Sequence, residues 1–271
     1  MMKRLEKKGG SRIALYMLLL VAAVCAMVSL RVCRQEHEHA SAEVDGVKPV
    51  RVAIQYSPVT FFVDGDTLGG FDYTLLQMTG LPVRIFPVAD PSEGLAGLEA
   101  GRYDLLIADM PQSVADSGLY AFTVPAYIDR QVLVQLTDSV GGEPQITSVL
   151  QLAGDTVYVT KDSPMAGRLR NIVRETGSEI HVKEVATTSE KLVIGRVLGD
   201  VGGPVVVNER VAQALAADYP RLDYSLQISF SQFQPWVVRA SDGKLLDIVN
   251  ARLDSIRDTP AYARLVARYF D

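Results

Sequence analysis

Cysteine is scarce in this chain of 271 residues, and the two that it has, Cys25 and Cys33, lie close to the N-terminus. No disulfide can therefore form within the long remainder of the chain. A domain built from that remainder must be stabilised by its hydrophobic core, and 48% hydrophobic residues are enough to build one.

Histidine is nearly as rare, with three in the chain. His37 and His39 lie in a polar, aperiodic stretch that supplies none of the further fixed ligands that a structural metal site needs. His181 lies on an expected strand and has no evident catalytic partner. We find no Ser-His-Asp set, metal-ligand cluster or glycine-rich phosphate loop in the sequence, so we expect no metal, no cofactor and no enzymatic activity.

An excess of basic residues is also missing. The formal net charge is −5, and because the first twelve residues contribute +4, the remaining residues carry −9. Proteins that bind nucleic acid neutralise phosphates with clustered Lys and Arg. The acidic composition therefore argues against nucleic acid as a partner.

One long uncharged run is present, over residues 13–30, between a basic segment at 1–12 and Arg31. Eighteen helical residues span roughly 27 Å, close to the bilayer core of about 30 Å. We predict an uncleaved signal anchor whose basic end stays in the cytoplasm. The run is longer than the apolar region of a typical cleaved signal peptide, which is the alternative. Lipid modification of a cysteine is a further alternative, although valine precedes both cysteines.

Residues 31–48 are polar and aperiodic, which predicts a linker. Strand patterns then alternate with helix patterns, which is typical of α/β folds with parallel sheets. The expected strands are Val50–Ile54, Val83–Phe86, Leu105–Ala108, Thr156–Val159, Ile180–Val185 and Val205–Val207. The first expected helix follows Phe71, and the second runs from Glu93 to Ala100 with Ser92 as its N-cap. Further helices are expected over Ser148–Leu152, Ser163–Thr176, Ser189–Leu198, the residues after Asn208, Leu246–Ile256 and Pro260–Phe270.

These elements fall into two halves. The sequence predicts that they join over residues 127–137, with Val132–Val134 as an extended crossing segment, and that residues 222–239 form the return crossing. The strand at 105–108 stops at Asp109, and in an open parallel sheet ligands sit just beyond the carboxyl ends of the strands. We therefore expect a binding site where such strand ends meet.

Several short motifs occur in a fixed order: Gly70-Phe71-Asp72, the stretch 98–104, the stretch 122–127, the stretch 152–157 and the ending from Trp236 to Phe270. In their order and spacing, residues 49–271 resemble the extracytoplasmic solute-binding proteins of the polar amino-acid type. Within that family, residues 52–73 are most similar to the solute-binding module of the membrane-bound lytic transglycosylase F group. Members of that group continue into a lysozyme-like domain, which we expect to be absent after Asp271.

The resemblance implies an α/β fold of the two-lobed periplasmic-binding-protein type 2 with two hinge crossings, and the N-terminal transmembrane helix predicted from the uncharged run would precede it. The implied lobes are 49–130 with 235–271, and 131–234. A small molecule would bind between them, and closure about the hinge would follow. The implied location is the bacterial inner membrane with the domain in the periplasm, and the implied partner is an ABC permease or an envelope signalling protein.

The resemblance also implies ligand-binding positions at strand ends and helix starts. They are Tyr56, Phe61, Met110, Gln112, Ser113, Asp162, Ser163, Asn208 and Glu209. Aromatic side chains would form an apolar wall, and the free amides at a helix start favour a carboxylate. Tyr56 and Phe61 can equally serve as packing residues.

Two positions depart from the family pattern. Asp116 stands where members usually carry the arginine that grips an α-carboxylate, and Asn208 stands where they carry an acid for the α-ammonium, unless Glu209 replaces it after a shift of one residue. A bidentate guanidinium clamp is thereby lost. We therefore expect a peptide-like or otherwise modified ligand rather than a standard free amino acid.

Other residues receive structural interpretations. We expect Trp236 in the core, Asp72 in the turn before a helix and Asp104 at a strand entrance. Asp116 and Glu209 could form an acid–base pair, but charged loop residues are usually solvated. Two other functions stay open: an enzyme on the same fold, either a dehydratase or a cell-wall enzyme, and an envelope interaction module without a ligand.

Overall fold

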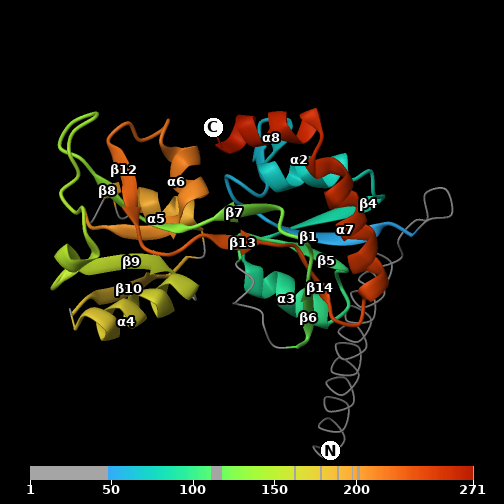
Figure 1. Cartoon of the computed structure of the whole chain (residues 1–271), viewed down its shortest axis with the longest axis horizontal. Helices are drawn as coiled ribbons and strands as arrows, with labels where there is room; N and C mark the ends of the chain where they lie inside the picture. Colours follow the sequence, from blue (N-terminus) through green and yellow to red (C-terminus); the bar gives the residue numbers. More distant parts are fainter. Residues whose placement is uncertain are drawn as a thin grey trace, which may run out of the picture. The chain divides into compact units, whose positions relative to one another are not determined.

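Two five-stranded sheets organise the chain in this computed structural model (Figure 1). The structure describes residues 48–110, 118–161, 163–177, 179–187, 189–196, 198–199 and 202–270. Both sheets belong to one unit, Val50–Asp271. Within the described ranges no helix has the length and apolar character needed to cross a membrane, and the predicted span at 13–30 lies outside them.

The first sheet has the strand order β4-β1-β5-β14-β6. Its strands are β1 (Val50–Gln55), β4 (Val83–Val88), β5 (Leu105–Ile107), β6 (Tyr120–Phe122) and β14 (Val237–Arg239). Its helices are α2 (Phe71–Met78), α3 (Pro91–Glu99), α7 (Gly243–Arg257) and α8 (Pro260–Phe270), and a small hairpin pairs β2 (Phe62–Asp64) with β3 (Thr67–Gly69). The helices α2 and α8 lie on one side of the sheet and α3 lies on the other (Figure 1).

The second sheet has the strand order β10-β9-β11-β8-β12. Its strands are β8 (Gln131–Leu136), β9 (Thr156–Thr160), β10 (His181–Val185), β11 (Val205–Asn208) and β12 (Leu222–Gln227). The helical elements are a 3₁₀ turn, η2 (Val149–Leu152), and the helices α4 (Pro164–Thr176), α5 (Glu190–Arg196) and α6 (Glu209–Leu215). Helix α4 packs on one face of this sheet, and α5 and α6 pack on the other face.

Two chain segments connect the sheets. They carry the short strands β7 (Tyr127–Asp129) and β13 (Gln232–Gln234), which pair with each other antiparallel (Figure 1). The prediction that Val132–Val134 form the crossing was wrong, because these residues lie in β8, paired with β11 and β12. They are fully buried between the helices of both faces, and an apolar run of that kind is typical of an interior strand.

The alternation of strands and helices predicts parallel sheets, but both sheets are mixed. The pairs β1–β4, β1–β5 and β9–β10 are parallel, whereas β14 and β8 run antiparallel to their neighbours. The reason is the crossing itself. Each crossing brings the chain into the next sheet directly, without a helical connection that would reverse its direction.

Most predicted helix boundaries agree with the structure. Helix α4 is capped by Ser163, whose Oγ accepts from Met165 N at 3.1 Å, and ends before Gly177 in the left-handed conformation. The N-cap of α3 was predicted wrongly, because Asp90 rather than Ser92 accepts from Glu93 N. Proline at the first helical position favours a start at residue 91.

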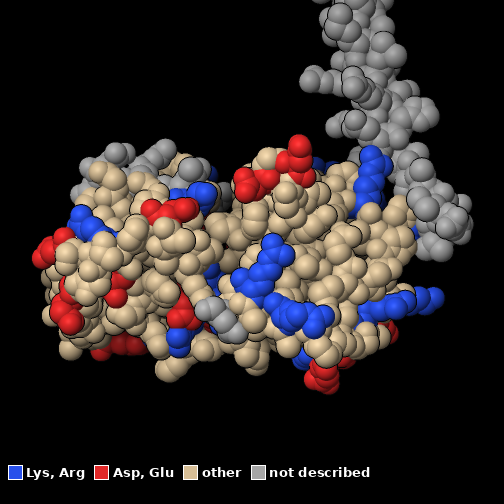
Figure 2. Space-filling model, turned by 90° about the horizontal axis from the view of Figure 1, so that it is seen from above, with Lys and Arg blue, Asp and Glu red and all other residues tan. Residues whose placement is uncertain are grey.

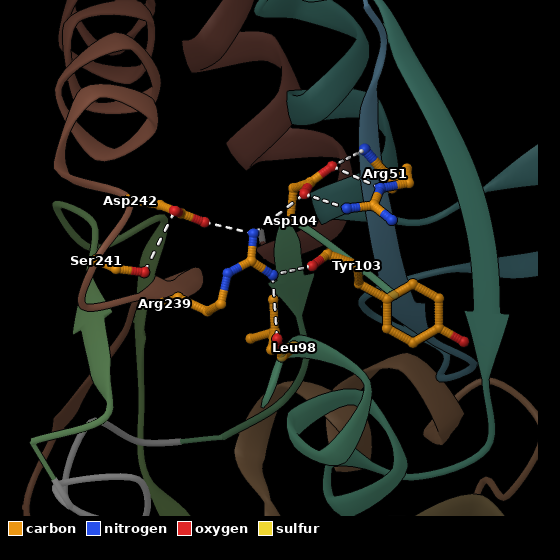
Figure 3. Close-up of polar contacts among 7 residues, drawn as sticks. All are labelled: Arg51, Leu98, Tyr103, Asp104, Arg239, Ser241 and Asp242. Atoms are coloured by element: carbon orange, nitrogen blue, oxygen red, sulfur yellow. Dashed lines mark hydrogen bonds and ion pairs between the residues drawn. The ribbon is translucent and has the colours of Figure 1, made fainter. Parts of the chain in front are cut away.

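Asp104 fixes the entrance of β5 (Figure 3). Its Oδ2 accepts from the backbone N and the Nε of Arg51 on β1, at 3.0 and 2.9 Å, and its Oδ1 accepts from Arg51 Nη2 at 2.7 Å. Arg239 of β14 adds a contact at 3.2 Å and also pairs with Asp242 at 2.5 Å. One carboxylate thus ties three neighbouring strands together.

Charged side chains are dispersed on the face shown in Figure 2. Basic and acidic residues form separate small groups there, divided by uncharged surface. Among the described residues on this face there is no continuous basic surface of the kind that follows a phosphate backbone.

Candidate functional site

A pocket lies between the two sheets, at the ends of their strands and the starts of their helices. Its cavity volume is about 100 Å³, within a larger space of about 850 Å³ that includes open solvent. The first sheet and its loops contribute Gln55, Tyr56, Ser57, Pro58, Asp90, Pro91, Ser92, Leu95, Asp109 and Met110. The second sheet contributes Gln131, Thr160, Lys161, Ser163, Met165, Ser189, Glu190, Asn208 and Val211.

The first wall follows directly from strand geometry. Because β1 and β5 are parallel neighbours, their carboxyl ends reach the same sheet edge, which brings Gln55 beside Asp109. Gln55 Oε1 accepts from Asp109 N at 2.9 Å. Tyr56 follows Gln55 and is 51% exposed, so its ring is free to contact a ligand.

The second wall consists of three helix starts. Ser163 begins α4, Glu190 is the first residue of α5 and Asn208 precedes α6. Asn208 stands at the N-cap position of α6, but its side chain makes no capping hydrogen bond, although its residue type is typical of a helix cap. Its amide therefore stays available to the pocket, where it is part of the lining.

Carboxyl groups in the pocket lining and close behind it influence one another. Burial raises the pKa of Glu190 well above its ordinary value, and the charge of Asp109 adds to the effect. Burial raises the pKa of Asp129 to about 7, and Asp109 contributes there as well. Like charges in a poorly hydrated space favour the protonated form of a carboxyl group.

Asp109 is also linked to a buried acid behind the pocket. Its Oδ1 accepts from Thr60 Oγ1 at 2.7 Å and from Tyr127 OH at 2.8 Å. Thr60 in turn contacts the carboxyl group of Asp72, which is 2% exposed and accepts from Trp236 Nε1 at 2.8 Å. Burial raises the pKa of Asp72 to about 8.

Gly70 allows α2, and with it Asp72, to approach Thr60 this closely. The glycine has φ +120°, and a Cβ atom at this position would lie 2.3 Å from the Thr60 carbonyl oxygen. No other residue fits there without moving the backbone.

The Asp72→Asn variant is expected to be more stable than the wild type at alkaline pH. A carboxyl group whose pKa is raised in the fold stabilises the protein below its unfolded value of 3.8, and this stabilisation is lost as the pH rises through about 8. Asparagine offers an acceptor to Trp236 and a donor to Thr60 without ever ionising.

Thermal unfolding between pH 5 and pH 9 checks this expectation. We expect the melting temperature of the variant to exceed that of the wild type by roughly 5 °C at pH 9, and the gap to close toward pH 5. A gap that widens toward acidic pH would show that Asp72 is ionised in the fold.

The predicted site residues divide into three groups. Tyr56, Met110, Ser163 and Asn208 are part of the pocket lining. Phe61 and Glu209 are not: Phe61 is 4% exposed and packs edge-on under Tyr56, and Glu209 pairs with Arg130 at 2.6 Å. Gln112, Ser113 and Asp162 lie outside the described residues, as does Asp116. Ligand binding by each of these residues stays a prediction.

Besides Asp90, which caps α3, three charged lining residues were not among the predicted site residues: Asp109, Lys161 and Glu190. A signal for each was present, because Asp109 and Lys161 directly follow buried strands and Glu190 opens a helix after a strand. Among the described residues no group of three or more His, Cys, Asp or Glu is placed to hold a metal ion.

Comparisons with known proteins agree with this geometry. A family model described as bacterial extracellular solute-binding proteins, family 3, matches residues 50–271. A curated relative, the membrane-bound lytic murein transglycosylase F of Shewanella pealeana, is 23% identical over 188 residues. That match covers 67% of this chain and only 38% of the length of the relative.

Solved structures share the fold. An arginine-binding protein variant from T. maritima has a TM-score of 0.68 at 22% identity, covering 82% of this chain and 94% of that one. A putative L-cystine ABC transporter protein from Listeria monocytogenes has a TM-score of 0.69 at 20% identity, covering 82% and 96%. The GluR0 ligand-binding core from Nostoc punctiforme, in complex with L-glutamate, has a TM-score of 0.67 at 19% identity, covering 82% and 100%.

These matches confirm both the resemblance seen in the sequence and the two-lobed α/β fold of periplasmic binding proteins. The family model spans nearly all of the chain after residue 49. The chain belongs to the bacterial extracellular solute-binding proteins of family 3.

Proposed function

We propose that this protein is a membrane-tethered solute-binding protein that closes two lobes around a small amino-acid-like or peptide-like ligand. The proposed lobes are residues 49–130 with 235–271, and residues 131–234. One observation carries the proposal: a single pocket is lined by strand ends and helix starts of both sheets. A ligand that contacts both walls stabilises the closed arrangement of the hinge.

The distribution of polar groups in the pocket favours a ligand with separated charges. The start of α4, at Ser163, leaves backbone N–H groups that suit a carboxylate, and Lys161 lines the pocket close by in sequence. Asp109 and Glu190 suit a cationic group. The similar structures include an arginine-binding protein variant, a putative L-cystine ABC transporter protein and a ligand-binding core in complex with L-glutamate, which supports an amino-acid-like ligand here.

The proposed location is the periplasmic face of the bacterial inner membrane, with residues 13–30 as the anchor and 31–48 as the linker. The uncharged run and its basic flank support this, and the family is extracellular. The proposed role is delivery of the ligand to an ABC permease or to an envelope signalling protein. Signal cleavage after export and lipid attachment are the alternatives for the N-terminus.

A thermal-shift panel of amino acids, dipeptides and cell-wall fragments tests the proposal. A ligand at 100 times its dissociation constant adds about 2.7 kcal/mol to the free energy of unfolding. We expect at least one probe to raise the melting temperature, and Asn208→Leu to reduce that shift, because the variant places an apolar side chain of similar size in the pocket wall. A shift that is unchanged in Asn208→Leu, or no shift across the panel, would contradict binding at this site.

Cell-wall fragments are in the panel because of one specific observation, the match to the lytic murein transglycosylase F. A second candidate function is therefore recognition or processing of murein-derived material. Fragment turnover without a stable complex would favour this candidate over solute binding, and stable binding without turnover would favour the first proposal.

A further inference from the structure

The charged side chains around the pocket are unbalanced. Among the described lining residues, three are acidic, namely Asp90, Asp109 and Glu190, and one is basic, namely Lys161. Asp90 is engaged as the N-cap of α3 and accepts from Glu93 N at 2.9 Å. Asp109 and Glu190 also accept hydrogen bonds, but neither forms an ion pair with a described residue.

Glu190 has weak partners for a group in its position. Both of its carboxyl oxygens lie 3.3 Å from the backbone N of Asn208, and within the described part of the chain no cationic side chain pairs with it. Among the described residues, the side-chain donors to the Asp109 carboxyl group are uncharged, namely the hydroxyl groups of Thr60 and Tyr127. Two carboxyl groups from opposite walls thus line the same space without a counter-ion from the described residues.

A cation placed between these groups would allow both to be ionised at once, because it offsets the repulsion between the two carboxylates. Charge-assisted hydrogen bonds from an ammonium or guanidinium group are about twice as strong as neutral ones. An uncharged group of the same shape would leave both carboxyl groups without a counter-ion. The arrangement therefore discriminates by charge rather than by size.

We propose that the pocket selects a ligand of net positive charge, whose ammonium or guanidinium group binds between Asp109 and Glu190. This inference rests on the proposed function, because it specifies the chemistry of the ligand in that same pocket. The inference also agrees with the residue type at position 116, where family members usually carry an arginine and this chain has Asp116. This position therefore adds no positive charge that would oppose a cationic ligand.

Cation binding should release a proton. Burial raises the pKa of Glu190, and the charged groups that act on it are Asp109 beyond β5 and Asp129 on β7, while Lys161 beyond β9 lines the same pocket. A bound cation favours the ionised carboxylate, so the affinity for the cation rises with pH over the range in which the empty site is protonated. A neutral ligand gives no such pH dependence through this group.

The matched pair L-arginine and L-citrulline tests the inference, since the two differ in a guanidinium and an uncharged urea of nearly equal shape. L-lysine and L-norleucine form a second pair. With the full chain in detergent, calorimetry at pH 7.5 is expected to show tenfold or more tighter binding of the cationic member. Calorimetry in two buffers of different ionisation enthalpy measures the proton that is released.

Variants identify the responsible group. Glu190→Gln is expected to reduce the cation preference about tenfold and to abolish most of the proton release, whereas Glu190→Asp keeps the preference. Glu179→Gln is the matched control, because Glu179 is exposed and is not part of the pocket lining. A control variant that behaves like Glu190→Gln would overturn the assignment.

The outcomes separate the inference from the proposed function. If the neutral members bind as tightly as the cationic ones, the charge selection is overturned and solute binding stands. If Glu190→Gln keeps the full preference for the cationic ligand, the assignment of this preference to Glu190 is overturned. If neither these probes nor the wider panel binds to the folded protein, the inference and the proposed function fail together.

Discussion

Replacing Trp236 by alanine is expected to lower the free energy of unfolding by about 4 kcal/mol, within the range for large-to-small changes of buried aromatic residues. The side chain is 1% exposed and is not part of the pocket lining, as the core interpretation of the sequence expects. Its loss leaves a cavity and removes the indole donor to the buried Asp72, which is held at 2.8 Å.

The position of Trp236 extends the effect to the hinge. Its backbone N donates to Thr123 Oγ1 at 2.9 Å, and Thr123 N donates to the Trp236 carbonyl at 3.0 Å. The indole therefore packs where the two crossing segments meet and enter the first sheet. We expect the variant to bind any ligand found in the panel more weakly, because the crossings lose their common support.

Urea denaturation followed by circular dichroism measures the loss. Trp236→Phe is the matched control. It keeps most of the apolar volume and loses the hydrogen bond to Asp72, so we expect a loss of about 1–2 kcal/mol. A loss below about 1 kcal/mol for Trp236→Ala would show that the side chain is not buried as described.

The second large effect is expected for Asp104→Asn, at about 3 kcal/mol, the lower end of the cost of leaving a buried ion unpaired. Asparagine cannot neutralise Arg51, whose side chain is 16% exposed, whereas Arg239, at 23% exposed, keeps Asp242 as a carboxylate partner (Figure 3). The three strands joined by this carboxylate include β1 and β5, whose ends form the first wall of the pocket.

The pH dependence of this effect has a definite sign. Burial works to raise the pKa of Asp104, but the hydrogen bonds from Arg51 and Arg239 outweigh it and lower the pKa below its ordinary value of 3.8. A carboxylate with a lowered pKa stabilises the fold above its unfolded value, and the stabilisation disappears as the pH falls through the folded value. The difference between wild type and Asp104→Asn should therefore be full at pH 7 and shrink below about pH 4.

Asp242→Asn is the control for this measurement. Asp242 pairs with the same Arg239 but is 29% exposed and contacts no second arginine among the described residues. We expect it to cost less than 1 kcal/mol, as for partly exposed ion pairs. Equal losses for the two variants would mean that Asp104 has no special role in joining the strands.

The parts of the fold that could be predicted are those that local chemistry decides. Ser163 and Gly177 mark both ends of α4, because a hydroxyl cap and a left-handed glycine act within one turn of the helix. The pocket position at the ends of β1 and β5 also follows from a general rule about strand ends. The family resemblance implied Met110 and Tyr56 at these strand ends, and both line the pocket.

The parts that could not be predicted depend on contacts between distant segments. Phe61 and Tyr56 have similar sequence contexts, and only the packing against Tyr73 shows that Phe61 lies behind the pocket wall. Asn208 has the residue type of a helix cap, but its side chain does not cap α6. The interior position of Val132–Val134 arises from pairing with β11, whose strand lies more than seventy residues later.

Hydrogen exchange tests the central claim most directly, that one ligand contacts strand ends of both sheets. The full chain is compared with and without the probe that gives the largest thermal shift. We predict that the bound probe slows amide exchange in both segments together, residues 55–58 of the first sheet and residues 205–211 of the second. Protection confined to one of these segments, or located at the exposed pair Ile128 and Phe233 of the crossing strands, would contradict binding between the two sheets.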